Sequence, residues 1–529
     1  MLRRFALSLL IVLLAALPAN ALSTDRFASL ADRQALAWRN IVVDLNVLAP
    51  YYVRPGVQPI WVDGTRPTPA AEQLFEALSR AHEDGLTASD YLPLALTQMT
   101  GLSDETDALG FELAMSQAYM SFARDLHAGR TTPSVTDPEI VIARKDVDAR
   151  AWLGMVVRSD VQSALANLAP QHRQYYQLRQ MLSGYRALAE RGGWPLVPAG
   201  AVLKPGMRDA RIVDMRRNLT ARGYSGLNAA DPTVYDDGLK TVVEHFQKRH
   251  GLDADGIAGP ATFGAMNITA DERVRQIIIN MERWRWLPVE LGSRHVFVNQ
   301  AGFEMMTFNG GKKVDTRRII VGKPFHKTPI FSDEIRYAEF NPTWTVPTSI
   351  AGRSLLPKFQ SDPSLVQRDG YSVYAGWSGD APQLNATAID WNSVSSSRFP
   401  YRIVQQPGPE NALGQVKFMF PNKFAIYLHD TPGRQLFART GRAFSSGCIR
   451  IVDPLQFAEL LFGMDGNIDR NKITSIIDSA KTTRVNFKQR IPVHLAYFTT
   501  WIDDDGVPYF YDDVYERDLL VGRLLFGSI

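Results

Sequence analysis

The sequence predicts a multidomain α+β protein in which helical segments precede a β-rich domain. A chain of 529 residues is too long for a single hydrophobic core. Apolar residues recur at helical spacing before about residue 287, and from Arg294 onward they alternate with the period of two that is typical of strands. The chain is 45% hydrophobic and 21% charged, as in ordinary globular proteins, and its net charge of +3 gives no electrostatic case for nucleic-acid binding.

Residues 1–21 have the pattern of a secretory signal peptide. Arg3 and Arg4 are followed by an apolar run from Phe5 to Leu17, and Ala19-Asn20-Ala21 fits the small-x-small rule for cleavage. An uncleaved membrane anchor is the alternative, but the run is shorter than the roughly 20 residues that a bilayer requires. We therefore expect an exported protein.

Residues 22–200 are predicted to form a helical scaffold domain that carries no catalytic motif. A Pro/Gly-rich stretch from Trp194 to Gly206 marks its end. Three sets of apolar residues within it have helical spacing: Trp38, Ile41, Leu45 and Leu48; Ala71, Leu74, Phe75 and Leu78; and Tyr175, Leu178, Leu182 and Tyr185.

Residues 201–268 are predicted to form a small domain of three helices, followed by a connecting helix over 269–290. Two apolar stripes define the first two helices, and a turn rich in Asp and Gly at 251–259 leads into the third. The Asp-x-Asp-Gly within that turn lacks the further oxygen ligands of a calcium loop, so we predict no metal site and no cofactor.

Residues 291–500 are predicted to form a β-rich domain, either a barrel or a sandwich. Turn signals at Ala301-Gly302 and Asn309-Gly310-Gly311 separate the first strands. An insertion over about 349–401 is long enough to be a lid or binding loop, with a passive surface loop as the alternative. Further strands are expected at 424–429 and 493–501 and a helix at 454–461, whereas the C-terminal tail, 501–529, has no assignment.

The one cysteine of the chain, Cys448, stands in a motif suited to nucleophilic catalysis. A thiol requires a base or a positive neighbour to react near pH 7, and His429 lies nineteen residues earlier. Gly447 permits a tight turn that could direct the N–H groups of residues 447 and 448 at one oxyanion, and Ser445 and Ser446 could add hydroxyl donors. An inert buried thiol is the alternative interpretation.

The expected chemistry includes an ion pair between these two side chains. A free thiol has a pKa near 8.5, so proton transfer to His429 would form the thiolate of Cys448 well below that pH. Asp430 and His494 are the two other residues that could act as the base.

This motif resembles the signature of the L,D-transpeptidases, whose catalytic domain is of the YkuD type. His429 followed by Ser445-Ser446-Gly447-Cys448-Ile449-Arg450 is similar to that signature, although Ser446 replaces the second histidine of most members. The Ser-Ser-Gly-Cys form is similar to the large YcbB-like Gram-negative subgroup, which Asn341–Pro347 also resembles. The helical segment over 22–200 resembles the scaffold domain of that subgroup, and residues 201–268 resemble a peptidoglycan-binding domain.

The resemblance implies a periplasmic enzyme of cell-wall peptidoglycan biosynthesis. In it Cys448 would be the nucleophile and His429 the base, while Gly447, Ser446, Ser445 and Arg450 would shape the oxyanion site. Tyr427 and Trp344 would contact substrate. The thiol would attack a tetrapeptide stem at diaminopimelate, release D-alanine, and pass the acyl group from a thioester to a second stem as a 3→3 cross-link.

The resemblance further implies that the insertion caps the active site, that carbapenem β-lactams inhibit the enzyme, and that other wall-synthesis enzymes are partners. Several alternatives remain. Water or a lipoprotein could resolve the thioester, which would make the protein an L,D-carboxypeptidase or a lipoprotein-attaching transpeptidase. The intact pair of His429 and Cys448 argues against a wall-binding protein without catalysis. The absence of the local cysteine motif of papain-like proteases argues against that class.

Overall fold

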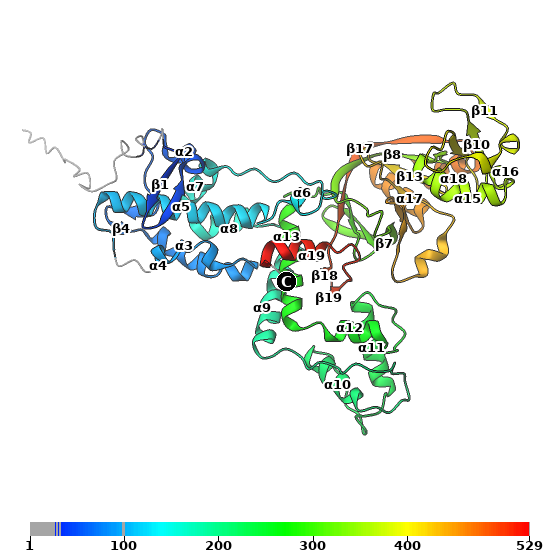
Figure 1. Ribbon diagram of the computed structural model, residues 1–529. Helices are drawn as coiled ribbons and strands as arrows, with labels where there is room; N and C mark the ends of the chain where they lie inside the picture. The colour runs from blue at the N-terminus through cyan, green and yellow to red at the C-terminus, as the bar shows by residue number, and fades with distance from the viewer. Residues whose placement is uncertain (1–26, 28–29, 31–32, 98–100, 528–529) are drawn as a thin grey trace, which may run out of the picture. The chain divides into compact units, whose positions relative to one another are not determined.

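The computed structural model describes Phe27, Leu30 and residues 33–97 and 101–527, so the signal-like segment lies outside the described residues. These residues divide into two units (Figure 1). The N-terminal unit contains the chain up to Arg130 together with Lys145–Gln171, and the C-terminal unit contains Thr131–Arg144 and His172–Ile529. Within the described ranges, no helix has the length and apolar character needed to cross a membrane.

The N-terminal unit packs short helices and two small hairpins around one long helix, α5 (Glu105–Ala128). The buried carboxylate of Glu112 on α5 accepts hydrogen bonds from the Tyr52 hydroxyl at 2.6 Å and from the Ile60 and Trp61 amides at 2.7 Å. The other elements are β1 (Ala35–Trp38), β2 (Ile41–Asp44), α2 (Leu45–Tyr52), β3 (Val62–Asp63), β4 (Arg66–Pro67), α3 (Pro69–Ser79), α4 (Leu94–Thr97), α7 (Ala149–Arg158) and α8 (Val161–Leu168).

The helical spacing over 38–48 proved misleading in its first half. Trp38 and Ile41 pair across the β1–β2 hairpin, and the two residues between them, Arg39 and Asn40, have positive φ values of 45° and 67°. Two successive residues in that region make the tight turn of a two-residue hairpin. The spacings over 71–78 and 175–185 were correct, because they lie on α3 and on α9 (Arg173–Glu190).

Helix α9, which falls within residues 22–200 of the predicted scaffold domain, lies in the C-terminal unit. It packs along α13 (Ala270–Trp286), the predicted connecting helix, and Figure 1 shows the two side by side. Tyr175, Leu178 and Leu182 share a buried cluster with Ile277 and Met281. Burial of this apolar stripe against α13 therefore fixes α9 to the C-terminal unit.

The predicted three-helix domain consists of α10 (Arg211–Ala221), α11 (Asp237–Arg249) and α12 (Pro260–Asn267), packed around its own buried cluster. The side chain of Gln247 on α11 fastens the turn that follows. It donates to the carboxylate of Asp255 at 3.0 Å and accepts from the amide of Gly256 at 2.9 Å.

The β-rich domain closes into a barrel, one of the two expected arrangements. Its strand order is β15-β7-β16-β14-β13-β8-β17-β5-β6, and β6 also pairs with β7, which closes the sheet. The strands are β5 (His295–Asn299), β6 (Glu304–Asn309), β7 (Lys312–Gly322), β8 (Phe331–Phe340), β13 (Val416–Met419), β14 (Leu428–His429), β15 (Ala443–Ser445), β16 (Ile449–Ile451) and β17 (Thr483–Ala496).

Two predicted strands are shorter in the structure, for a shared physical reason. The side chain of Asn422 accepts hydrogen bonds from the Phe424 and Ile426 amides, which holds residues 422–426 in a turn and leaves only β14 as strand. Likewise Asn299 accepts from Phe498, and the segment expected over 493–501 breaks between β17 and β18 (Thr500–Ile502). Asparagine side chains compete with ladder hydrogen bonds in this way.

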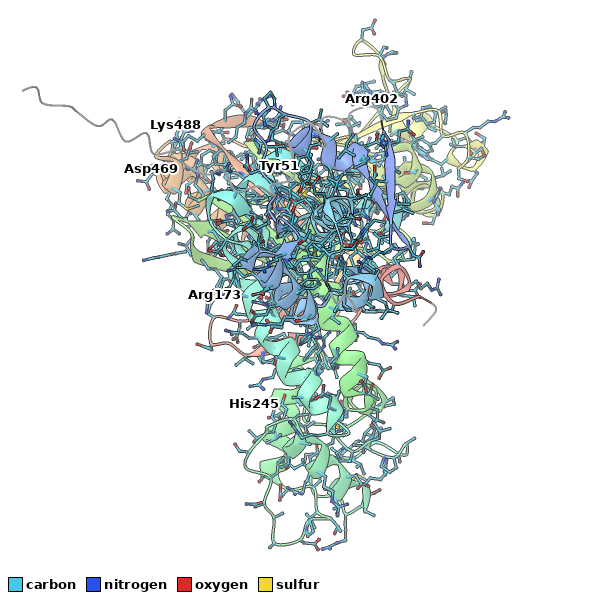
Figure 2. All side chains as sticks on the ribbon, turned by 90° about the vertical axis from the view of Figure 1, so that its left-hand side faces the viewer. Tyr51, Arg173, His245, Arg402, Asp469 and Lys488 are labelled. Carbon is cyan, nitrogen blue, oxygen red and sulfur yellow. The ribbon has the colours of Figure 1, made fainter. Side chains whose placement is uncertain are left out.

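The insertion forms a small subdomain, which we call the cap and define as residues 344–405. Its sheet has the order β11-β10-β12-β9, and its buried cluster includes Phe359, Val373 and Trp391. Arg402, labelled in Figure 2, lies with its guanidinium 4.1 Å from the ring centroid of Tyr374. The elements are β9 (Trp344–Thr345), α14 (Thr348–Ile350), α15 (Leu356–Ser361), α16 (Leu365–Arg368), β10 (Tyr371–Tyr374), β11 (Gln383–Leu384) and β12 (Arg402–Gln405).

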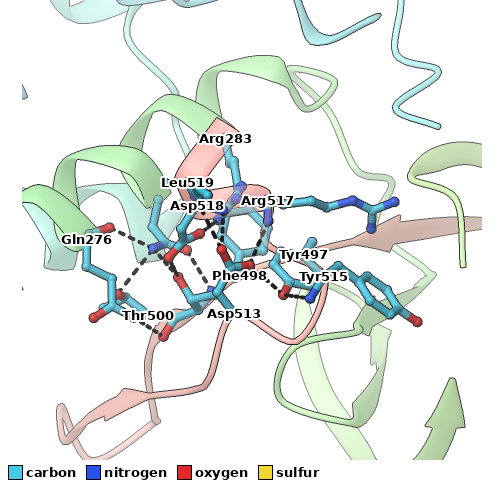
Figure 3. Close-up of polar contacts among 12 residues, drawn as sticks. Gln276, Arg283, Tyr497, Phe498, Thr500, Asp513, Tyr515, Arg517, Asp518 and Leu519 are labelled. Carbon is cyan, nitrogen blue, oxygen red and sulfur yellow. Dashed lines mark hydrogen bonds and ion pairs between the residues drawn. The ribbon is translucent and has the colours of Figure 1, made fainter. Parts of the chain in front are cut away.

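After the cysteine motif, the chain forms α17 (Pro454–Asp465), which confirms the predicted helix start, and then α18 (Arg470–Asp478). The tail without an assignment is also ordered. It contains β18, β19 (Pro508–Phe510) and α19 (Arg517–Phe526), and Figure 3 shows the polar network that holds it. Asp513 is the centre of that network, because its carboxylate accepts from the Tyr497 hydroxyl and from the Arg517 and Asp518 amides at 2.7–2.8 Å.

Candidate active site

Cys448 lies in a short turn between β15 and β16, and it is partly exposed. The turn is fastened from within, because the Ser445 hydroxyl donates to the Cys448 carbonyl at 2.5 Å and accepts from the Gly447 amide at 3.1 Å. Gly447 has φ = 118°, and a Cβ atom there would lie 3.3 Å from Ile426. Glycine is therefore required both for the backbone conformation and for space.

His429 ends β14 and is almost fully buried, with 4% of its surface exposed. Its Nδ1 lies 2.5 Å from the backbone carbonyl oxygen of Asp430. Because a carbonyl can only accept, Nδ1 carries the proton in the neutral ring and Nε2 keeps the free lone pair. The ring is thus held in the tautomer that can accept a proton at Nε2.

Strand pairing brings these two segments together. β14 and β16 run parallel, with Leu428 opposite Ile449 and His429 opposite Arg450. Since alternate residues of a strand share a face, Cys448 and Arg450 lie on the same side of the sheet as Tyr427 and His429. The rings of Tyr427 and His429 are 5.5 Å apart, and the Cys448 sulfur lies 3.7 Å from the Ala425 carbonyl oxygen.

A row of charged residues extends this face on the other side of His429. Lys417 on β13 is opposite His429, and Glu339 on β8 is opposite Lys417. Lys417 and Glu339 form an ion pair of 2.8 Å in which both side chains are largely buried. His429 therefore lies between two cations, Arg450 and Lys417.

The electrostatics of the site favour a neutral pair over the expected ion pair. Burial lowers the pKa of His429 to about 3, and the charge of Arg450 adds to the effect. Burial likewise raises the pKa of the Cys448 thiol to about 11, although hydrogen bonds from the amide and hydroxyl of Tyr427 and the charge of Arg450 act in the opposite direction. Both shifts stabilise thiol and imidazole in the resting state, which differs from our expectation.

The expected oxyanion site is also changed. The Gly447 amide is already bonded to the Ser445 hydroxyl, so it is not a free donor, and Ser445 serves to fasten the turn. Ser446 is exposed at the surface of the turn. The Cys448 amide donates to no acceptor among the described residues, and the Tyr427 hydroxyl lies beside the sulfur.

Residues distant in sequence support the turn from behind. The Thr328 hydroxyl donates to the Gly447 carbonyl at 2.8 Å and accepts from the Gly322 amide at 2.9 Å. From the tail, the Tyr515 hydroxyl donates to the Gly322 carbonyl at 2.6 Å, and the guanidinium of Arg517 donates to the Thr328 carbonyl at 3.2 Å. The tail thereby reaches the cysteine turn through Thr328.

The other predicted residues have different surroundings. Trp344 belongs to β9 and packs on the core of the cap. Asp430 uses its carboxylate to accept from the Gln415 and Thr431 amides, which is a structural role. His494 is engaged at both ring nitrogens, at 2.8 Å with the Ser332 hydroxyl and at 2.9 Å with the Leu291 carbonyl, so it has no free lone pair for the thiol.

Comparisons with known families match three parts of the chain. Residues 293–464 match the L,D-transpeptidase catalytic domain, residues 46–182 a scaffold domain, and residues 208–266 a family described as "Putative peptidoglycan binding domain". Residues 293–464 are an L,D-transpeptidase catalytic domain. The fold predicted from the sequence is thus confirmed as a scaffold domain, a peptidoglycan-binding domain and a transpeptidase domain.

A curated relative from Haemophilus influenzae, named "Putative L,D-transpeptidase", is 33% identical over 244 residues, which are 46% of this chain and 48% of that protein. The chain thus spans about half the length of the curated relative that it matches. Two solved L,D-transpeptidases, from Xylanimonas cellulosilytica and Stackebrandtia nassauensis, are each 13% identical, with TM-scores of 0.17 and 0.20. The first alignment covers 56% of this chain and 98% of the solved chain, and the second covers 57% and 96%.

Sequence reasoning missed the supporting residues of the transpeptidase domain. Thr328 carries no motif of its own, and Tyr515 and Arg517 lie in the tail that had no assignment. Lys417 alternates with the buried Val416 and Phe418, and this pattern of one charge within an apolar strand was the available signal.

Proposed function

We propose that this protein is a peptidoglycan L,D-transpeptidase that forms 3→3 cross-links through a thioester on Cys448. The observation that supports it best is the shared face of β14 and β16, which presents Cys448, His429 and Tyr427 together within a transpeptidase domain. The peptidoglycan-binding domain in the same chain supports a wall-polymer substrate.

In this proposal proton transfer accompanies attack. The thiol of Cys448 gives its proton to Nε2 of His429 as the sulfur adds to the carbonyl carbon of diaminopimelate in a tetrapeptide stem. The oxyanion is stabilised by the Cys448 amide and the Tyr427 hydroxyl. The imidazolium then protonates the leaving nitrogen, D-alanine departs, and the thioester remains.

Deacylation reverses these roles. His429, neutral again, takes a proton from the amine of a second stem as that amine attacks the thioester carbonyl, and the thiol of Cys448 is restored. The product is a 3→3 cross-link. Arg450 and Lys417 on either side of His429 disfavour a lasting imidazolium, so the ring returns its proton readily.

Export to the periplasm is part of the proposal, because residues 1–21 have the pattern of a signal peptide. Inhibition by carbapenems is also proposed: a β-lactam carbonyl would acylate Cys448 as the stem peptide does. Other wall-synthesis enzymes remain proposed partners. Fractionation of cells that express the full chain tests the localisation, and a cytoplasmic protein with an intact N-terminus would contradict it.

The decisive experiment incubates the purified protein with disaccharide-tetrapeptides and weighs the products. We expect 3→3 dimers from the native chain and none from Cys448→Ala, whose thermal midpoint should stay within a few degrees. Tripeptides alone would instead indicate an L,D-carboxypeptidase that uses water, and no product from either protein would favour a wall-binding role without catalysis. Dimers made by a folded Cys448→Ala protein would exclude the proposed nucleophile.

His429→Ala tests the base. We expect acylation of Cys448 by a carbapenem to slow by at least ~10²-fold at pH 7, which is the lower range for general acid–base catalysis. Intact-protein mass spectrometry follows the acylation, and His245→Ala is the matched control because His245 is exposed on α11 (Figure 2). Acylation of His429→Ala at the native rate would show that another group is the base.

A further inference from the structure

Apart from the active site, a hollow lies between the peptidoglycan-binding domain and the barrel. Its volume is about 630 Å³, and neither Cys448 nor His429 lines it. One wall is the turn after α11, the opposite wall is the β6–β7 hairpin with residues 438–442, and β18–β19 of the tail form the floor. A neighbouring hollow of about 510 Å³ shares Leu252, Tyr511 and Asp512 with it, so the two form one extended groove.

Specific contacts join the walls. The Thr440 hydroxyl hydrogen bonds to the carboxylate of Asp253. The ring of His250, at the end of α11, is stacked 5.8 Å from the ring of Phe510 on β19. A Cβ atom added to Gly251 would lie 3.4 Å from the ring of Tyr511, at ordinary van der Waals distance. The groove is therefore a built feature of the C-terminal unit.

The walls carry exposed cations that form no ion pair. Lys248, Arg318 and Arg439 are exposed and, among the residues that the structure describes, none of them lies within 4.0 Å of a carboxylate, although Glu304 in the same lining interacts with Lys248 and Arg318 over a longer distance. Lys313 in the same groove contrasts with them, because it pairs with Asp504 at 2.7 Å. In the whole lining, five cationic side chains stand against the three carboxylates of Glu304, Asp503 and Asp512, and this excess of positive charge favours an anionic ligand.

Aromatic side chains complete the surface. Tyr509 and Tyr511 on the tail are partly exposed in the groove, with ring centroids 6.2 Å apart and an interplanar angle of 30°. The ring of Tyr509 offers an apolar face to a ligand. Tyr511 supports it from below, because its ring packs against Gly302 and Gly251 and burial raises the pKa of its hydroxyl well above the usual value. A ligand with both flat apolar faces and carboxylates fits such a groove.

We propose that this groove binds a second stretch of peptidoglycan, with a sugar ring on Tyr509 and stem-peptide carboxylates at Lys248, Arg318 and Arg439. The proposal rests on the proposed function, which makes peptidoglycan the substrate. It assigns the peptidoglycan-binding domain a composite site whose second wall is the transpeptidase domain. Either domain alone would provide only part of the contacts.

The groove also shares a segment with the catalytic turn. Residues 438–442 line the groove and lead directly into β15 and Cys448. Arg442 fixes this segment, because its guanidinium donates to the carbonyls of Ile319, Arg439 and Phe303 at 2.8–3.1 Å. A polymer held here would contact the same segment that positions the nucleophile.

Charge reversal tests the cations. The variant Lys248→Glu/Arg439→Glu is compared with Arg217→Glu/Lys472→Glu, which makes the same change in net charge at two exposed sites outside the groove. Exposed ion pairs contribute modestly, so we expect the dissociation constant for purified disaccharide-tetrapeptide to rise roughly three- to tenfold in the groove variant and to stay unchanged in the control. Equal affinity in the two variants would overturn the proposal.

A second pair of variants distinguishes a glycan from a free anionic peptide. Tyr509→Phe keeps the ring, whereas Tyr509→Ser removes it. We expect only Tyr509→Ser to weaken binding of the disaccharide-tetrapeptide, with no effect on the tetrapeptide without sugar. Equal weakening for both probes, or for neither, would exclude stacking of sugar on this ring.

Failure of the groove proposal can be distinguished from failure of the proposed function. Binding is expressed per mole of protein that unfolds cooperatively on heating, so misfolded protein is not counted and no activity of Cys448 is assumed. If the native chain forms no 3→3 dimers yet binds through the groove, the proposed function fails and the groove remains. If dimers form and the groove variants bind normally, the groove proposal fails alone.

Discussion

The cap and the C-terminal tail both lie outside the strands that carry Cys448, yet they are built in opposite ways. The cap has its own four-stranded sheet and its own buried cluster around Trp391. The tail contributes its buried residues to the cores of the barrel and of α13, among them Tyr515, Val521 and Phe510. The tail is therefore part of the transpeptidase domain, whereas the cap is a separate folding element inserted into it.

The difference extends to the active site. Tyr515 and Arg517 of the tail hydrogen bond to Gly322 and Thr328, and Thr328 holds the carbonyl of Gly447. Trp344, the predicted substrate residue at the edge of the cap, packs with part of its side chain on the core of the cap. Changes in the tail should thus affect stability and catalysis together, while changes in the cap core should stay local.

The largest expected effect comes from Arg517→Leu. Arg517 is fully buried and pairs with Asp137 at 2.9 Å, so its loss leaves a buried carboxylate without its cation. Breaking a buried pair in this way costs ~3–5 kcal/mol of unfolding free energy. Urea denaturation measures it, with Arg523→Leu, an exposed residue on the same helix, as the control. A loss no greater than in the control would show that the tail is not part of the core.

A smaller effect is expected from Tyr515→Phe. The substitution keeps the ring but removes the hydroxyl that donates to Gly322 and accepts from the Thr328 amide. Leaving these buried backbone groups without a hydrogen bond lowers the free energy of unfolding by ~1–3 kcal/mol. Because these partners support the cysteine turn, carbapenem acylation should also slow, by up to about tenfold. Tyr374→Phe in the cap is the matched control, and equal acylation rates in the two variants would separate the tail from the catalytic turn.

A still smaller global effect is expected from Trp391→Ala. The cavity should destabilise the cap by ~3–5 kcal/mol while the barrel keeps its stability, because Trp391 packs only within the cluster of the cap. Hydrogen exchange followed by mass spectrometry should show faster exchange confined to residues 344–405. Phe457→Ala in the barrel core is the comparison. If Trp391→Ala lowered the protection of barrel amides against exchange as much as Phe457→Ala does, the cap would not be a separate unit.

The sequence predicted most of the elements that local pattern determines. The three helices over 207–268, the connecting helix and the start of α17 follow from apolar spacing and caps, which act within a few residues. The hairpin at Arg39-Asn40 was missed because Trp38, Ile41 and Leu45 mimic a helical stripe. Strand ends set by Asn422 and Asn299 depend on side-chain hydrogen bonds that periodicity does not reveal.

The catalytic motif of the site could be predicted from the sequence, but the residues that hold this motif in place could not. Cys448, Gly447 and His429 stand in a short pattern whose chemistry is legible from residue type. The neutral state of the pair could not be inferred, because it results from burial and from Arg450 and Lys417, which reach His429 only through strand register. Tyr515 and Arg517 act from almost two hundred residues away, as their bonds to residues 322 and 328 show.

A pH-dependent effect on stability tests which region buries the site. Folded His429 has its pKa lowered to about 3, whereas the unfolded chain binds that proton near pH 6.5. The unfolded state therefore gains protons first as the pH falls, and this residue opposes folding increasingly from pH 6.5 down to about 3. At pH 7 the effect is absent. We expect His429→Gln to unfold less readily than the native chain at pH 4 and equally at pH 7, with His245→Gln unchanged at both.

The pKa shifts of His429 and Cys448 also predict how the rate of carbapenem acylation depends on pH. With the pKa of His429 near 3 and that of Cys448 near 11, the neutral pair persists between them, so carbapenem acylation should vary little from pH 5 to pH 9. Because the strands around β14 and not the cap core surround His429, Trp391→Ala should give the same flat profile. Acylation measured by intact mass across this range checks both statements. A rate that falls below pH 7 in Trp391→Ala alone would show that the cap, and not the barrel, keeps the imidazole neutral.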